Sequence, residues 1–502
     1  MEGDTKQYIH YLSAPVQEVQ DMEQTQELRI SDGMPDIGRI LASWGQALLR
    51  GKQWESDGVS LSAGAMVWVL YEPEEGGQPQ IVESWIPMQL QWDLPEETPE
   101  GEMLAQVLLR FVDARCLSAR KLSIRAGICA MMQALTPAQA ELWQPEQEEG
   151  DIQLLTSTYP MLLPVEAGEK AFLVDETLTL PPSEPEMETL LYGAAEPVVT
   201  DKKLLGDKVI FRGFLRHHVL YRGEGEQLNS WDFEVPFSQF APLEGSFSND
   251  AQPVILTGVQ SLEQELDEEG HLHLKCGVLA QYLVRRMEAI TVTEDAYSPT
   301  RELDIQWQEL MLPGVLEVQN RTLSAEQEIA QPCKRVADTL FLPDQPRQRR
   351  TEDTVQWTMP GTFQLLCCTE DGSLQGVSTR WQGELSQKAG QDSMMLCRIL
   401  PGSPAQSRST GDGISARAEY TAELTTLSRA GIRMVSGIIP GQEKQLRENR
   451  PSLILCRAGE ESLWDLAKKC GSTVSAISQA NHLEGEPEAG RMLLIPAYGN
   501  SE

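Results

Sequence analysis

The chain has 502 residues, of which 41% are hydrophobic and 23% are charged, and it contains 11 tryptophans. This length exceeds what one hydrophobic core usually serves, so we expect three or four globular domains, and the composition excludes a largely disordered protein. The 75 acidic residues outnumber the 41 basic ones and give a formal charge of -34, which argues against nucleic acid and anionic lipid surfaces as partners.

The first residues lack the basic and apolar regions of a secretory signal, and no later stretch approaches the roughly 20 apolar residues that span a bilayer. We therefore expect a cytoplasmic protein without direct membrane insertion. In that reducing compartment the nine cysteines, which form no Cys-x-x-Cys pair, are expected to be buried thiols.

Two segments of the chain share a pattern that indicates an internal repeat. Pro35 and Pro185 are each followed by an acidic residue and an apolar stretch, for which we predict a short helical turn. Tyr71 and Tyr221 lie 36 residues after these prolines, and each closes a long apolar strand. A turn rich in glycine and glutamate follows both strands. This matched spacing predicts two copies of one domain.

A third copy is predicted from weaker signs. The segment FLPDQP, residues 341–346, precedes another apolar strand in which Cys367 takes the place of the two tyrosines. Each copy is expected to close with a strand hairpin, most clearly at residues 261–284, where apolar and polar residues alternate around a turn at 267–270. Many short alternating strands, separated by proline and glycine, predict a mainly β protein with three β-sandwich-like repeats.

The C-terminal segment shows another pattern: strand, helix, helix, strand. Ser462 is placed to cap the first helix, and Gly471 to end it in the left-handed conformation. Ser472 or Thr473 begins the second helix, and the apolar residues 493–495 form the closing strand. The segment is therefore predicted to be a small α+β (βααβ) domain.

Residues 453–496 resemble the LysM family, through motifs that include Ser462-Leu463-Trp464, Ala480-Asn481 and the closing Leu-Leu-Ile-Pro. LysM modules bind glycans that contain N-acetylglucosamine in a shallow groove between two loops. Here the first loop is one residue longer than the usual Gly-Asp-Thr-Leu, and the second holds three glutamates. The resemblance implies a glycan- or partner-binding site at Gly459, Glu460, Glu461, Ser462, Leu483, Glu484 and Gly485.

The second copy resembles the SPOCS domain of spore coat and spore envelope assembly proteins, and the first copy is similar to it. The resemblance implies a scaffold in the mother-cell cytoplasm, at the forespore surface. Its LysM domain would dock to a coat morphogenetic protein of the basement layer or to cortex peptidoglycan. We place the SPOCS-like repeats at residues 1–150, 165–310 and 311–445, and the LysM domain at residues 451–498.

The sequence offers no signature of catalysis, since the usual motifs for phosphoryl transfer, zinc hydrolysis and serine hydrolysis are missing. His271 and His273 share a strand face, but no ligand set completes a metal site, so these two and His218 are expected at the surface. His217 is expected in the core. We predict no enzyme, metal or cofactor. Two alternatives stay open: a glycan-binding protein linked to cell-wall hydrolysis, and a general cytoplasmic binding protein, both unrelated to sporulation.

Overall fold

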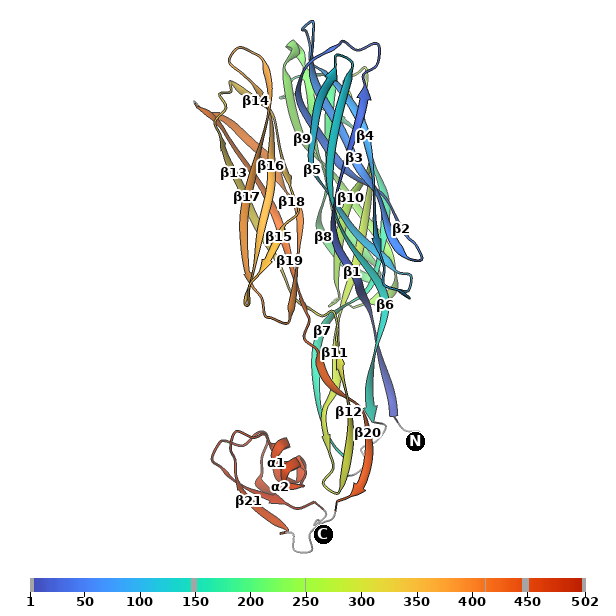
Figure 1. Cartoon of the computed structure of the whole chain (residues 1–502), viewed down its shortest axis with the longest axis vertical. Coiled ribbons are helices and arrows are strands. Elements are labelled where there is room, and N and C mark those ends of the chain that lie inside the picture. Colours follow the sequence, from blue (N-terminus) through green and yellow to red (C-terminus); the bar gives the residue numbers. More distant parts are fainter. Residues whose placement is uncertain (1–3, 146–150, 249, 411, 445–450, 499–502) are drawn as a thin grey trace.

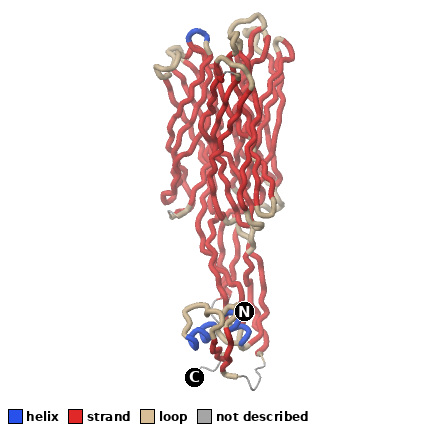
Figure 2. The backbone as a smooth tube through the Cα atoms, turned by 90° about the vertical axis from the view of Figure 1, so that its left-hand side faces the viewer, coloured by secondary structure: helices blue, strands red, loops and turns tan. Residues whose placement is uncertain are grey.

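The structure is a computed structural model that describes residues 4–145, 151–248, 250–410, 412–444 and 451–498. Strands make up most of the chain, so the predicted mainly β fold is confirmed. Figure 1 shows a broad body of upright strands, a narrower stalk below it, and a small C-terminal domain with two helices at the foot of the stalk. Some of the strands run from the body into the stalk without interruption (Figure 2).

The first copy is a sandwich of two antiparallel sheets. Its strands are β1 (Asp4–Arg29), β2 (Ile37–Trp54), β3 (Gly58–Pro73), β4 (Gln80–Asp93), β5 (Glu102–Ser118) and β6 (Lys121–Pro145). One sheet has the order β1-β6-β5, and the other is the meander β2-β3-β4. Apolar residues of both sheets form one core, because alternate residues of each strand face inward.

The second copy repeats this arrangement. Its strands are β7 (Gln153–Thr179), β8 (Met187–Gly223), β9 (Leu228–Phe247), β10 (Gln252–Leu266) and β11 (His271–Tyr297), with a short 3-10 helix, η1 (Glu224–Glu226), after β8. The sheet β10-β11-β7 corresponds to β5-β6-β1, and β8 with β9 corresponds to the meander. The predicted hairpin is confirmed, since β10 pairs with β11 around a turn that ends at Gly270, whose φ is +81°.

The third copy has the same strand order, but the long strands that correspond to β1 and β6 are each broken in two. Its strands are β12 (Arg301–Leu310), β13 (Val315–Ile329), β14 (Arg335–Pro343), β15 (Arg347–Arg350), β16 (Thr354–Cys368), β17 (Leu374–Lys388), β18 (Ser393–Thr410), β19 (Gly413–Ser428) and β20 (Ile432–Glu443). Strands β18, β19 and β13 correspond to β5, β6 and β1. Pro313 lies in the break between β12 and β13, where a residue without an N–H donor is tolerated.

The helical turns predicted after Pro35 and Pro185 are wrong, because strands β2 and β8 begin there. Strand β2 pairs with β3 along its length, and its extended pairing with an apolar neighbour outweighs the local helical pattern. The Tyr71 hydroxyl donates a hydrogen bond to the Pro35 carbonyl at 2.9 Å. The repeated spacing of 36 residues therefore reflects a strand pair.

Cys367 takes the position of Tyr71 in the third copy, as predicted, since it lies opposite Val336 near the start of β14. The segment FLPDQP does not correspond to the Pro35 segment. It lies at the end of β14 and in the connection to β15, with Phe341 opposite Phe363 in the middle of β16. The four domain limits given above stay predictions.

The stalk is built by the lower ends of three strand pairs, β1–β6, β7–β11 and β12–β20. Each pair contributes apolar side chains to one shared core, which includes Ile9, Leu142, Leu163, Ile290, Leu310 and Met434. Since no single pair could bury these side chains by itself, the stalk depends on all three copies.

Buried glutamines join the first two copies. The Gln46 side chain donates to the Ala195 carbonyl at 2.7 Å and accepts from the Ala195 N–H at 3.0 Å. Gln281 makes the same pair of bonds to the backbone of Ala105, at 2.7 and 2.8 Å. Each glutamine side-chain amide thus forms hydrogen bonds with both the backbone N–H and the backbone carbonyl of a buried alanine, which otherwise would need a neighbouring strand as partner.

His218 joins the second and third copies, so its predicted place at the surface is wrong. Its ring nitrogens lie 2.8 Å from Asp232 and 2.7 Å from Asp338, and its side chain is only 12% exposed because the third copy covers it. Burial lowers the pKa of His218, but the two carboxylates outweigh burial and raise the pKa to about 10. His217 is fully buried and stacks on Phe233, as expected for a core histidine.

Five of the nine cysteines are buried: Cys129, Cys276, Cys333, Cys367 and Cys397. The expectation of buried thiols is wrong for Cys116, which is exposed near the end of β5, and is met only in part at Cys368, Cys456 and Cys470, which are half-buried.

Candidate functional site

The C-terminal domain has the predicted βααβ order. Its elements are β21 (Leu453–Arg457), α1 (Leu463–Cys470), α2 (Val474–Asn481) and β22 (Met492–Pro496). The two strands pair antiparallel, and both helices pack their apolar sides against the inner face of the pair. We call this unit, residues 453–496, the LysM domain.

The helix ends follow the sequence signals. The Asp465 N–H donates to the Ser462 hydroxyl at 3.1 Å, so Ser462 caps α1, and Gly471 ends α1 with a φ of +63°. Of the two residues predicted to begin the second helix, Thr473 does so, since its hydroxyl accepts from the Ala476 N–H at 3.1 Å. These caps are local, which explains why the sequence predicted them.

The first candidate loop, residues 459–462, is mostly free to meet a ligand. Gly459 and Glu460 are exposed, and no atom lies within 4 Å of the position that a side chain at Gly459 would take. Glu461 is exposed and pairs with Lys469 at 3.1 Å. Ser462 is committed to capping α1. Three of the four predicted residues therefore present accessible groups.

The second candidate loop, residues 483–490, likewise contains both a structural residue and exposed ones. The Leu483 N–H donates to the Ser478 carbonyl at 3.0 Å, and the Leu483 side chain packs against the core of the domain, so this residue closes α2. Glu484 and Gly485 are exposed. The accessible part of the predicted site in this loop is therefore Glu484 and Gly485.

Glu486 joins the two loops, although we did not predict it as a site residue. Its carboxylate accepts a hydrogen bond from the Leu463 N–H at 2.9 Å, at the beginning of α1. A carboxylate is favourable there because the N-terminal end of a helix carries a partial positive charge. Three glutamates in a loop that faces a helix N-terminus were the available signal, but the sequence could not select one of them.

The LysM domain docks on the foot of the stalk through α1 and the turn after it. The ring of Trp464 packs edge-on against Tyr297 of β11, with centroids 4.7 Å apart. The Trp464 Nε1 donates to Asp295 at 2.8 Å, and Lys468 pairs with the same carboxylate at 2.6 Å. The Tyr297 hydroxyl donates to the Ser472 carbonyl at 3.0 Å. Both candidate loops stay exposed in this arrangement.

A second surface of the LysM domain is apolar. The outer face of the β21–β22 pair carries four side chains that are 50%, 63%, 52% and 38% exposed: Leu453, Leu455, Met492 and Leu494. Their neighbours along each strand, such as Ile454 and Leu493, point into the domain. We call these four side chains the apolar face. Neighbouring exposed apolar groups of this kind are typical of protein contacts.

Within the ranges that the structure describes, no group of three or more His, Cys, Asp or Glu side chains could hold a metal ion. His271 and His273 both contact the Asp267 carboxylate, at 3.2 and 2.9 Å, where they stabilise the hairpin turn. Over the same ranges, no helix is long and apolar enough to cross a membrane.

Two family models match the chain. The model described as SipL, SPOCS domain, matches residues 186–261, which include β8 and β9, and the LysM domain model matches residues 458–496. No curated protein and no solved structure was found to match. The matches agree with the predicted combination of SPOCS and C-terminal LysM domains, of which LysM is a binding domain and SPOCS is in general non-catalytic. Together they suggest a sporulation-related protein that binds peptidoglycan.

Proposed function

We propose that the chain is a non-catalytic scaffold of the spore envelope, at the mother-cell side of the forespore surface, attached there by its LysM domain. The observation that supports this proposal is the way in which the LysM domain is presented. Trp464 and Lys468 hold it to the stalk, while residues 459–461 of the first loop and 484–485 of the second are exposed. The three copies above it form a large body available for further contacts, and several weak contacts on one chain add up to strong attachment.

The apolar face favours a protein as the main partner of the LysM domain, namely a coat morphogenetic protein of the basement layer. Leu455 is 63% exposed, and such a side chain gains stability by leaving water. A glycan containing N-acetylglucosamine is the second candidate partner. The LysM match supports it, and the site would comprise Gly459, Glu460, Glu461 and Ser462 in the first loop, with Leu483, Glu484 and Gly485 in the second.

Localisation in sporulating cells tests the proposal. A fluorescent fusion of the whole chain is expected to ring the forespore, whereas a version that ends at Asn449 is expected to stay diffuse. Leu455→Asp, on the apolar face, is expected to weaken the ring, while Glu269→Gln, in the exposed β10–β11 turn, leaves it intact. A diffuse signal from the whole chain would contradict the scaffold role.

Retention on insoluble peptidoglycan tests the second partner. Gly459→Trp adds a large side chain to the first loop, at a position where a Cβ atom would have no neighbour within 4 Å. Loss of retention in this variant, with retention kept in Leu455→Asp, would assign glycan binding to the loops. Retention together with a diffuse signal in cells would favour a glycan-binding protein unrelated to sporulation.

A further inference from the structure

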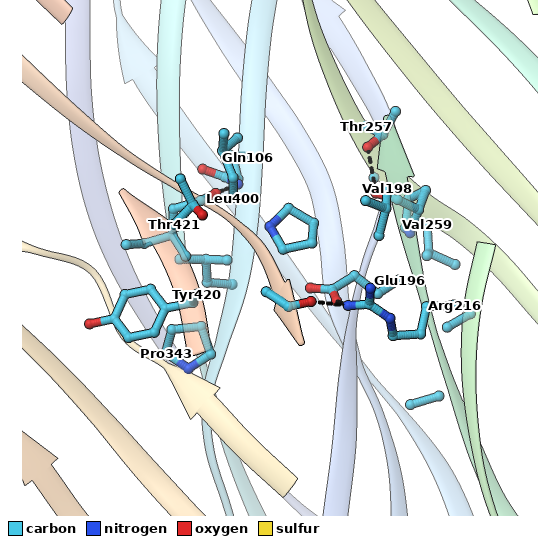
Figure 3. Close-up of a pocket in the computed structure, with 18 of the residues that line it drawn as sticks. Gln106, Glu196, Val198, Arg216, Thr257, Val259, Pro343, Leu400, Tyr420 and Thr421 are labelled. Atoms are coloured by element: carbon cyan, nitrogen blue, oxygen red, sulfur yellow. Dashed lines mark hydrogen bonds and ion pairs between the residues drawn. The ribbon is translucent and has the colours of Figure 1, made fainter. Parts of the chain in front are cut away.

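Strand β17 of the third copy has a long free edge. The copies meet around a cavity of about 550 Å³, and Figure 3 shows Gln106 of β5, Arg216 of β8 and Leu400 of β18 at its wall, one residue from each copy. None of the residues that line this cavity belongs to β17. Strand β17 pairs with β16 on one side, and among the described residues no strand pairs with its other side. An unpaired strand edge can bind another strand through its backbone groups.

The free edge presents the backbone groups of even-numbered residues. In an antiparallel pair, alternate residues bond to the neighbouring strand, and the residues between them point their N–H and carbonyl groups away. The Ala389 N–H donates to the Asp353 carbonyl at 3.1 Å, and the register has no shift along β17, so its odd-numbered residues face β16. At the start of β17 the first copy occupies the free side, where Arg39 donates to the Leu374 carbonyl at 3.3 Å. Beyond this contact, the outward backbone groups belong to six residues with exposed side chains: Ser378, Arg380, Gln382, Glu384, Ser386 and Lys388.

The corresponding edges of the first two copies are blocked by proline. Counted from the residues that pair with the tyrosine position described above, the same place holds Pro87 in β4, Pro236 in β9 and Gln382 in β17. The backbone bonds made by the Leu94 and Gly223 N–H groups set the alternation in β4 and β9, and both prolines direct their nitrogen away from the paired strand. A proline there removes no bond of its own sheet and prevents another strand from adding. In β17 every outward residue keeps its N–H donor.

We propose that β17 pairs antiparallel with β17 of a second copy, about a two-fold axis at Gln382. In this register Arg380 of each copy lies opposite Glu384 of the other, on the exposed face. Over the described residues, neither side chain has an ion-pair partner within its own chain. The adjacent registers that also match the outward backbone groups are centred on Trp381 and Gly383, and neither brings an arginine opposite a glutamate. The pairing forms about ten backbone hydrogen bonds.

The symmetry of this pair decides where the LysM domains lie. Strand β17 runs along the long axis of the body, and the LysM domain lies at one end of that axis (Figure 1). A two-fold axis through an antiparallel strand pair reverses the strand direction, so the two LysM domains lie at opposite ends of the dimer. The dimer therefore joins two attachment surfaces. This last step rests on the proposed function of the LysM domain, whereas the pairing of β17 does not.

Sedimentation velocity of the full-length chain over a range of concentrations tests the proposal. Salt at about 0.15 M is needed, because it screens the repulsion between two chains of formal charge -34. The mass is expected to rise with concentration from that of one chain to that of two. The dissociation constant is expected in the micromolar range, since one paired strand buries less than the roughly 1,200 Å² at which stable interfaces begin.

Gln382→Pro is expected to keep the chain monomeric at every concentration. The substitution removes an N–H that points away from β16, and the first two copies already carry proline at this place. The fold is therefore expected to be kept, with a melting temperature within about 2 °C of the wild type.

Reversal of the charges tests the register. Arg380→Glu places like charges opposite each other across the axis and is expected to raise the dissociation constant about tenfold or more. Adding Glu384→Arg to this variant restores opposite charges in both pairs and is expected to restore wild-type association. Glu83→Arg, a charge reversal at an exposed position of the edge strand β4, is the matched control and is expected to leave association unchanged.

Four results would overturn the proposal. The wild type could stay monomeric at every concentration, or its dimer could persist in Gln382→Pro. The double variant could associate no better than Arg380→Glu. Loss of the dimer in Leu455→Asp, with the dimer kept in Gln382→Pro, would place the contact on the apolar face of the LysM domain. Since β17 belongs to the body, the first three results leave attachment through the LysM domain untouched.

Discussion

The body and the LysM domain are held in place by different kinds of contact. In the body, the copies meet through buried polar groups, among which Asp338 is 2% exposed and contacts both His218 and Tyr192. The LysM domain has its own core and touches the stalk through one small patch around Tyr297 and Asp295. Removing one partner of a buried charged contact strongly lowers the free energy of unfolding. A small docked patch, in contrast, can separate from the stalk while both parts stay folded. We therefore expect the copies to unfold together and the LysM domain to detach independently.

Asp338→Ala is expected to have the largest effect, because it breaks the contact between the second and third copies. The change leaves His218 with one carboxylate and the Tyr192 hydroxyl without its acceptor, at a cost of about 3 to 5 kcal/mol in the free energy of unfolding of the body. Chemical denaturation followed by tryptophan fluorescence measures it. Asp304→Ala, in β12, is the control and should change little. Equal stability of Asp338→Ala and the wild type would mean that the copies are not joined here.

Alkaline pH is expected to weaken the contact of His218 with Asp338, but by less than Asp338→Ala does, because deprotonation removes the charge of His218 and leaves both side chains in place. Both ring nitrogens of His218 lie beside carboxylates, which requires the doubly protonated ring. The folded-state pKa of about 10 exceeds the ordinary value of 6.5. The stabilisation is therefore complete below about pH 6.5 and is lost as the pH rises through about 10. Melting temperatures from pH 7 to 10.5 measure this loss, which His218→Gln should reduce.

The contact between the LysM domain and the stalk is expected to weaken at acidic pH. Burial raises the pKa of Asp295, but its bonds to Lys468 and Trp464 outweigh burial and hold the pKa below 3.8. The ionised Asp295 carboxylate therefore stabilises the docked LysM domain fully above about pH 3.8. This stabilisation is lost as the pH falls through the lower pKa that Asp295 has in the folded protein. Hydrogen exchange at α1 should increase in acid before exchange in the body does. Simultaneous loss of both would contradict their independence.

Tyr297→Ala is expected to detach the LysM domain while the body stays folded. The substitution removes the ring that packs on Trp464 and the bond to the Ser472 carbonyl, a loss of roughly 2 to 3 kcal/mol in docking. Hydrogen exchange is expected to increase at α1 and at the end of β11, with the body unchanged. Tyr297→Phe keeps the ring and should lose only about 1 kcal/mol. Unchanged exchange at α1 in Tyr297→Ala would show that other contacts hold the domain.

Glu486→Gln is expected to have the smallest effect, confined to the LysM domain. Loss of the negative charge at the start of α1 should cost about 0.3 to 1 kcal/mol and increase hydrogen exchange at the Leu463 amide. Glu484→Gln removes an equal charge from the same loop and should leave that amide unchanged. The same increase in both variants would assign the effect to overall loop charge.

The sequence predicted the LysM domain better than the body for a physical reason. The caps at Ser462, Gly471 and Thr473 lie within a few residues of the groups that they satisfy, so the sequence alone contains both partners. The segment after Pro35 has a local helical pattern, but its conformation is decided by pairing with β3. Local signals predict local structure, and long-range pairing can override them.

By itself, the sequence determined the alternation of apolar and polar residues, the repeated spacing of 36 residues and the strand–helix–helix–strand order of the LysM domain, because each rests on neighbouring residues or on a regular period. Only the tertiary structure placed His218 between two carboxylates, Glu486 at the start of α1 and Trp464 against Tyr297. It also enclosed the cavity between the three copies. These features join residues that are far apart in the chain, and burial and charge pairing brought them together during folding.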